Sequence, residues 1–130
     1  MKEAIYIAGG GAVGAILRYL ISGVAYRVLG IGFPWGTLGV NLIGTFLIGF
    51  LWGIFERIVI LPEVKVFIFI GFLGAFTTFS TYAFETLNLL KEGELKMALF
   101  NILANNVLGI FLVFLGILTS KYLIFLVEKG

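Results

Sequence analysis

The chain has 130 residues, of which 61% are apolar and only 12% are charged, and its net charge is +2. Soluble domains are roughly 45–50% apolar, so this composition indicates an integral membrane protein. The absence of His, Cys and Asp excludes thiolate chemistry and His-ligated metal centres, and so small a positive charge offers no nucleic-acid surface. Because no paired carboxylates lie in the apolar segments either, we expect no enzymatic activity.

Charged residues and two prolines divide the apolar sequence into four blocks, each predicted to be a membrane-spanning helix. A helix needs about 20 residues to cross the bilayer core, so the chain has room for no more than four. The predicted helices cover residues 4–29, 35–55, 64–90 and 95–127. The loops are too short to hold a soluble domain. We therefore predict one all-α transmembrane domain over residues 1–130.

Two ionisable residues lie inside predicted helices: Arg18 in the first block and Glu85 in the third. Intramembrane charges are functional candidates by default. Near a membrane surface, however, Arg can extend to the interface and Glu can cap a helix. Both interpretations stay open from the residues alone.

The second block carries Thr37, Asn41 and Thr45 at intervals of four, which places them on one face of the helix. Glycines flank this polar stripe and let a neighbouring backbone approach closely. Two interpretations follow: a packing face with Asn41 bonded across helices, or the lining of a pore. In the fourth block Asn101 and Asn105 repeat the same spacing, and their amides suit a small anion that must bind and then leave.

The third block contains a cluster of hydroxyl side chains that follows two glycines: Thr77, Thr78, Ser80 and Thr81. Hydroxyls can satisfy backbone groups freed by a break, so the run predicts a broken third helix, unwound between Gly74 and Thr77. Such backbone is tolerated at membrane depth only where it is buried in protein or lines a polar cavity. The alternative is a kinked helix whose hydroxyls bond to their own carbonyls.

Lys and Arg in the loops give a weak orientation signal, with five on the side of the termini and three on the other. This permits a dimer of oppositely inserted copies, although an ordinary fixed topology with the termini inside is the simpler alternative. Four short helices are too few to enclose an aqueous path alone. The sequence therefore implies an oligomer.

Three segments of the chain, residues 10–19, 34–46 and 71–82, resemble the Fluc/CrcB family of fluoride channels. The resemblance covers all four predicted helices in order. It implies an antiparallel, dual-topology homodimer with two pores in a prokaryotic cell membrane, through which fluoride leaves the cytoplasm. It also implies a structural sodium ion on the dimer axis, ligated by the backbone carbonyls of Gly74 and Thr77.

Carried over residue by residue, the resemblance makes Asn41 the pore asparagine and Phe79 with Tyr82 an aromatic box. On spacing alone, these two aromatics would be core or lipid-facing residues, although ring edges carry partial positive charge that can attract an anion. The remaining fluoride-path residues implied by the family are Arg18, Ser80, Thr81, Asn101 and Asn105. The sequence departs from the family pattern at Tyr82, where many members have Phe, and at Asn101 and Asn105, where members often have Tyr and Ser.

Two other functions fit a chain of this size. A small proton-coupled multidrug-type exporter would need an acid in the membrane, for which Glu85 is the sole candidate. A scaffold subunit without transport would explain the glycines but leave the polar stripes without a role. A passive fluoride channel accounts for both features.

Overall fold

The computed structural model describes residues 1–130 as helices joined by short loops. Four helical rods are long and apolar enough to cross a membrane. The first two are α1 (Lys2–Leu29) and α2 (Trp35–Phe55). The third rod consists of α3 (Pro62–Lys65), η1 (Val66–Phe72), α4 (Leu73–Phe76) and α5 (Phe79–Lys91). The fourth consists of α6 (Leu95–Leu103), η2 (Ala104–Leu108) and α7 (Gly109–Lys129).

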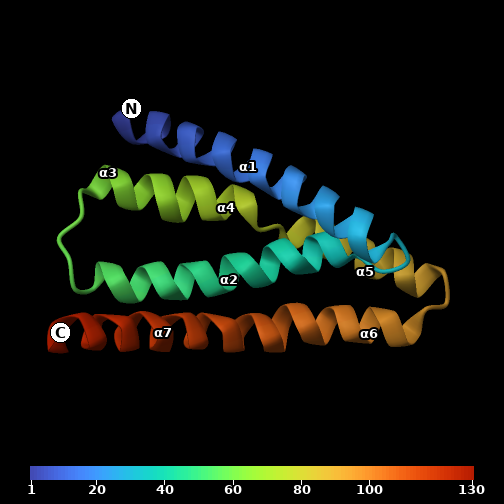
Figure 1. The fold of residues 1–130 in the computed structure, drawn as a ribbon. Helices are drawn as coiled ribbons and strands as arrows, with labels where there is room; N and C mark the ends of the chain where they lie inside the picture. The colour runs from blue at the N-terminus through green and yellow to red at the C-terminus, as the bar shows by residue number, and fades with distance from the viewer.

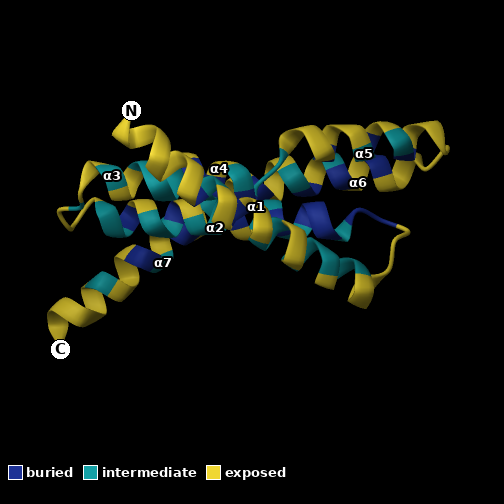
Figure 2. Ribbon diagram, turned by 90° about the horizontal axis from the view of Figure 1, so that it is seen from above, coloured by how far each residue is buried: buried dark blue, intermediate teal, exposed yellow.

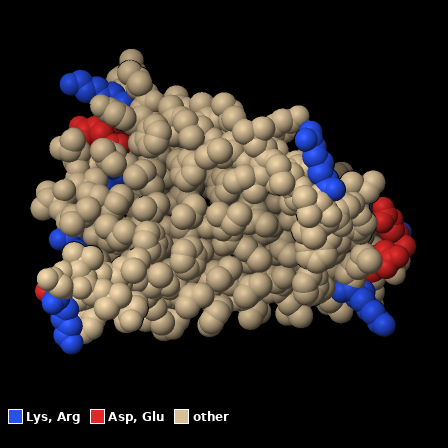
Figure 3. Space-filling view, viewed as in Figure 1, with Lys and Arg blue, Asp and Glu red and all other residues tan.

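The surface of the protein is that of a multi-pass membrane protein. The rods lie side by side, with both chain ends and the α2–α3 loop at one end of the molecule (Figure 1). Most large apolar side chains are exposed, and the buried residues lie mainly where helices meet (Figure 2). Charged side chains lie toward the two ends of the face seen in Figure 3, with an uncharged band between them. This band confirms the class that the composition predicts.

Close helix packing depends on glycines whose missing side chains admit a neighbouring backbone. In the contact between α2 and α7, a Cβ added to Gly49 would collide with the Val113 carbonyl, and one added to Gly116 would collide with the Phe46 carbonyl. Backbone atoms of η1 crowd Gly10 in α1 in the same way. Lipid provides no hydrophobic force between helices, so this close packing holds the rods together.

The third rod is interrupted between α4 and α5, as the hydroxyl-rich run predicts. Thr77 (φ −88°, ψ 157°) and Thr78 (φ −147°, ψ 118°) have extended backbone, and the chain passes between the two helices as a thin link in Figure 1. Thr78 then caps α5, because its hydroxyl oxygen accepts a hydrogen bond from the Thr81 N–H at 3.3 Å.

The prediction that the helix unwinds between Gly74 and Thr77 is wrong in position. Gly74 lies within α4, which continues to Phe76, and the only glycines with positive φ are Gly30 and Gly93, both outside helices. Two extended threonines make the break, and glycine's conformational freedom is not used there. The cause is a side chain from α2 that binds the backbone of Thr78, described below.

Replacing Gly49 with alanine is expected to destabilise the fold, because the new methyl group meets the Val113 carbonyl. Overpacking of this kind costs about 1–3 kcal/mol. Gly23→Ala is the matched control, since nothing lies within 4 Å of its added methyl group. Thermal unfolding of the two purified variants in detergent measures the difference. Equal stability would contradict the backbone contact between α2 and α7.

Candidate functional site

One asparagine holds the broken backbone in place. The Oδ1 atom of Asn41, on α2, accepts the Thr78 N–H at 2.8 Å, and its Nδ2 donates to the Thr78 carbonyl at 3.1 Å. Each unsatisfied backbone group in lipid costs several kcal/mol, so these two bonds stabilise extended backbone in the middle of a rod. Asn41 therefore bonds across helices, as the packing interpretation of the stripe predicts.

A chain of hydrogen bonds continues from Asn41 across the molecule. Asn41 Nδ2 donates to Asn105 Oδ1 at 2.9 Å, and Asn105 Nδ2 donates to the carbonyl and Oδ1 of Asn101 at 2.9 and 3.0 Å. Asn101 Nδ2 donates to Thr86 Oγ1 at 2.9 Å, and the Thr86 hydroxyl donates to the Tyr82 carbonyl at 2.8 Å. We call this chain the asparagine relay. It ties α2 to α6, η2 and α5, and each of its links donates in the same direction.

A polar cavity of about 190 Å³ lies beside the break. Two aromatic rings form part of its wall, those of Phe79 and Tyr82, with centroids 5.4 Å apart and planes inclined at 60°. Amides and hydroxyls form the rest, and no charged residue lines it. Its lining residues are Asn41, Thr45, Thr77, Thr78, Phe79, Tyr82, Asn105 and Asn106. Neutral dipoles and ring edges can hold a small anion and still release it.

The polar cavity brings together four of the residues predicted to lie on the fluoride path, Asn41, Phe79, Tyr82 and Asn105. Asn101 is 1% exposed and belongs to the relay, so it supports the cavity from behind without lining it. Ser80 is exposed on α5 and lines neither this cavity nor the next. The predicted residues therefore do not form one continuous row.

Arg18 and Thr81 lie in a second cavity, of about 300 Å³, between α1, α2 and α5. Glu85 lines this cavity too, so the two intramembrane charges share one space. Thr78 lines both cavities, which places the broken backbone between the charged space and the polar one.

Glu85 is held by hydroxyls from two other helices. Its Oε1 accepts the Thr37 hydroxyl at 2.8 Å and the Tyr26 hydroxyl at 3.3 Å, while its Oε2 is buried without a partner. Thr37 therefore faces away from the polar cavity, although it shares a stripe with Asn41 and Thr45. Four residues turn a helix about 40° past a full rotation, so a stripe at this spacing drifts around the helix.

The break also frees the two carbonyls implicated in sodium binding. In an unbroken helix the Gly74 carbonyl would accept the Thr78 N–H, and the Thr77 carbonyl would accept the Thr81 N–H. The first of these N–H groups bonds Asn41 instead, and the second bonds the Thr78 hydroxyl. Gly74 is exposed on the surface of the protomer. Released carbonyl oxygens suit a hard cation, so these residues fit sodium.

Two residues of the site, Asn106 and Thr86, are not among the residues predicted to lie on the fluoride path. Asn106 lines the polar cavity and donates Nδ2 to the Tyr82 hydroxyl at 3.1 Å. Thr86 is 8% exposed and closes the relay. The pair Asn105 and Asn106 was the available signal for the first. Asn105 and Asn106 lie in the π-helical segment η2, a rare geometry that often occurs at functional sites.

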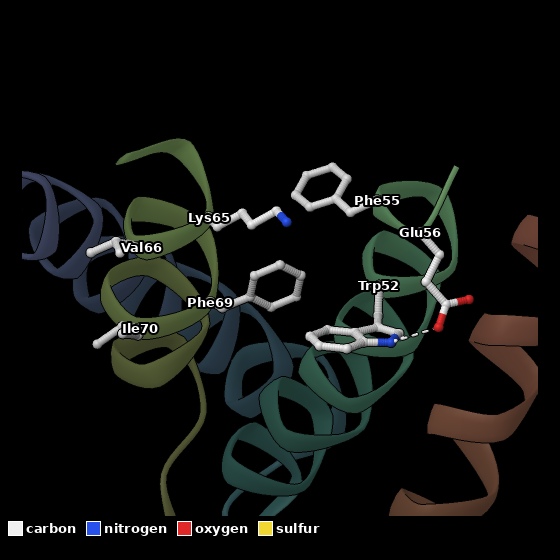
Figure 4. A pocket seen from close by; sticks show the side chains of 7 residues that line it. All are labelled: Trp52, Phe55, Glu56, Lys65, Val66, Phe69 and Ile70. Carbon is white, nitrogen blue, oxygen red and sulfur yellow. Dashed lines mark hydrogen bonds between the residues drawn. The ribbon is translucent and has the colours of Figure 1, made fainter. Parts of the chain in front are cut away.

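Another cavity, of about 420 Å³, lies elsewhere, between the end of α2 and the start of the third rod (Figure 4). Phe69 packs edge-on against Trp52 and Phe55, and the Trp52 indole N–H donates to Glu56 at 3.1 Å. Lys65 faces this group from α3 (Figure 4). Its walls are mainly apolar and offer no free amide or hydroxyl, so it lacks the donors of the polar cavity.

Comparison with known proteins identifies the family. The family described as CrcB-like protein, Camphor Resistance (CrcB), matches residues 5–117. A fluoride-specific ion channel FluC from Shewanella amazonensis is 51% identical over 116 residues, which are 89% of this chain and 94% of the relative. The protein of the same name from Magnetococcus marinus is 44% identical over 120 residues, 92% of this chain and 98% of the relative. The chain therefore belongs to the CrcB-like family.

Proposed function

We propose that this protein is a fluoride channel, which lets fluoride leave the cytoplasm passively through the polar cavity. This proposal rests on the polar cavity. The cavity lies at a helix break, and its walls consist of amides, hydroxyls and two aromatic rings without any charged group. The relatives named as fluoride-specific ion channels support fluoride as the ion, and channels are not enzymes.

The chemistry of the cavity explains passive conduction. A small anion gives up its water on entering, so the protein must offer N–H and O–H donors in exchange. Neutral donors bind the anion firmly enough for entry and loosely enough for exit. A glycine contact also brings α2 close to the break, because a Cβ added to Gly44 would collide with the Thr77 side chain.

The geometry gives no support to the alternative of a proton-coupled exporter that uses Glu85. The Glu85 carboxylate is half-buried against Thr37 and Tyr26 and does not line the polar cavity. An exchanging acid must meet the substrate on its path, and in this protein the acid and the asparagine lie in different cavities.

Purified protein in liposomes is expected to release fluoride and retain chloride. An uncoupled anion current is electrogenic, so efflux soon stops unless a cation leaves too. A fluoride electrode should therefore record sustained efflux once valinomycin lets potassium leave the liposomes with the fluoride. Collapsing the pH gradient should leave the rate unchanged. Efflux that stops with the pH gradient would instead support the exporter.

The variant Asn41→Ala is expected to lose most of its fluoride efflux in the same assay. It removes both bonds to Thr78 and the link to Asn105, and each lost bond to a buried group costs about 1–3 kcal/mol. We expect efflux to fall at least about tenfold. Asn88→Ala is the control, because the Asn88 side chain makes no such bonds. Equal rates in the two variants would remove Asn41 from the pathway.

The proposal includes an antiparallel homodimer with two pores. Phe79 helps to wall the polar cavity yet exposes 75% of its surface, so one protomer leaves the wall open to its surroundings. A second, oppositely inserted copy would cover this ring. The weak bias of Lys and Arg between the two ends permits both insertions.

Dual insertion predicts a labelling pattern. The chain has no native Cys, so a single cysteine in place of Lys2 reports the orientation of the end that carries both termini. An impermeant thiol reagent should label it about equally from the two sides of the cell membrane. Glu92→Cys, at the opposite end, should behave in the same way. Labelling of each variant from one side only would refute dual insertion but not the channel.

The proposal also includes a structural sodium ion, held by the carbonyls of Gly74 and Thr77 from two protomers. A Cβ at Gly74 has no neighbour within its protomer closer than the Phe69 carbonyl at 4.0 Å, so the protomer itself tolerates a larger residue. Gly74→Val should therefore act only across the dimer axis. We expect loss of the dimer and of efflux, with Gly23→Val, also in open space, as the control.

Sodium itself is tested separately in the wild-type protein. Efflux should require sodium and yet not follow its gradient, because a structural ion is not carried. Full wild-type efflux after prolonged exchange into sodium-free buffer would contradict this site, and so would a Gly74→Val variant that stays dimeric and active.

A further inference from the structure

Nearly every side-chain hydrogen in the polar cavity already has an acceptor within the protein. The amide hydrogens of Asn41 are donated to the Thr78 carbonyl and to Asn105, and those of Asn105 are donated to Asn101. Three threonine hydroxyls donate locally: Thr45 to the Leu42 carbonyl, Thr77 to the Leu73 carbonyl and Thr78 to the Thr81 hydroxyl. An arriving anion would have to break one of these bonds to obtain a donor from them.

Tyr82 is the exception. Its side chain is 8% exposed, and its hydroxyl oxygen accepts Asn106 Nδ2 at 3.1 Å. The same Asn106 nitrogen donates to the Ile102 carbonyl at 2.9 Å, which fixes the amide with its nitrogen toward the phenol. The phenol therefore cannot donate to Asn106, and no other protein atom accepts its hydrogen. A buried tyrosine hydroxyl normally finds such a partner.

We propose that the Tyr82 hydroxyl is the donor that first binds the anion in the polar cavity, and that Asn106 is the positioning residue that turns it there. This inference rests on the proposed function. It replaces the expected ring-edge contact of Tyr82 with an O–H donor, while Phe79 keeps its edge. A hydrogen bond to an anion is about twice as strong as one between neutral groups, and the bond accepted from Asn106 polarises the phenol further.

The test measures fluoride current against fluoride concentration in liposomes. Tyr82→Phe keeps the ring and removes the hydroxyl, so the half-saturating fluoride concentration should rise about tenfold or more. Asn106→Leu should shift it in the same direction but less, because the hydroxyl stays and loses its orientation. The double variant should match Tyr82→Phe alone, since Asn106 acts through the phenol. Tyr122→Phe and Asn88→Leu control for loss of any hydroxyl or amide.

Size-exclusion chromatography of each variant separates an effect on anion binding from an effect on folding. A positioning role for Asn106 leaves the elution volume unchanged, whereas a structural role does not. Wild-type saturation in Tyr82→Phe, or an Asn106→Leu effect that persists undiminished in the Tyr82→Phe background, would overturn the inference. If the wild-type protein carries no fluoride at all, the proposed function fails instead. The two failures are therefore distinguishable.

Discussion

The need to satisfy backbone hydrogen bonds inside a membrane constrains the whole structure. An extended segment at mid-membrane leaves N–H and C=O groups that lipid cannot bond. Here the amide of Asn41 pairs with both backbone groups of Thr78. Because that amide sits on a different rod, the break exists only when α2 is docked beside it. The fold and the candidate site therefore depend on one another.

The asparagine relay extends this dependence to the fourth rod. Asn105 and Asn101 connect the break to Thr86 on α5, so the second half of the broken rod is held by amides as well as by packing. Glycine contacts act where the amides do not, bringing α1 onto η1 and α2 onto α7. Only 23 of the 130 residues are buried in the protomer, so polar bonds and close backbone contacts replace the large apolar core of a soluble domain.

Local patterns in the sequence were sufficient to predict four rods and a break in the third, though not the exact position of the break, because span length, loop charges and clustered hydroxyls are features of neighbouring residues. These patterns were insufficient to predict which side chains would hydrogen-bond to one another across the rods. The bond between Asn41 and Thr78 joins residues 37 apart, and that between Thr37 and Glu85 joins residues 48 apart. Because a stripe at four-residue spacing drifts around the helix, Thr37 lies away from the polar cavity that Asn41 lines. The π-helical segment that contains Asn106 has no reliable signal in the sequence. Such pairings appear only once the rods are docked.

The chemical identity of the relay has a further consequence for the cell. Proton pathways in membranes are built from Asp, Glu or His side chains, which can take up and release a proton at each step. An asparagine amide can donate a hydrogen bond but does not exchange its hydrogen in that way. A line of asparagines can therefore support the wall of an ion pathway without also forming a proton wire. A bacterium can keep such a protein in its energised membrane without short-circuiting the gradient that drives ATP synthesis.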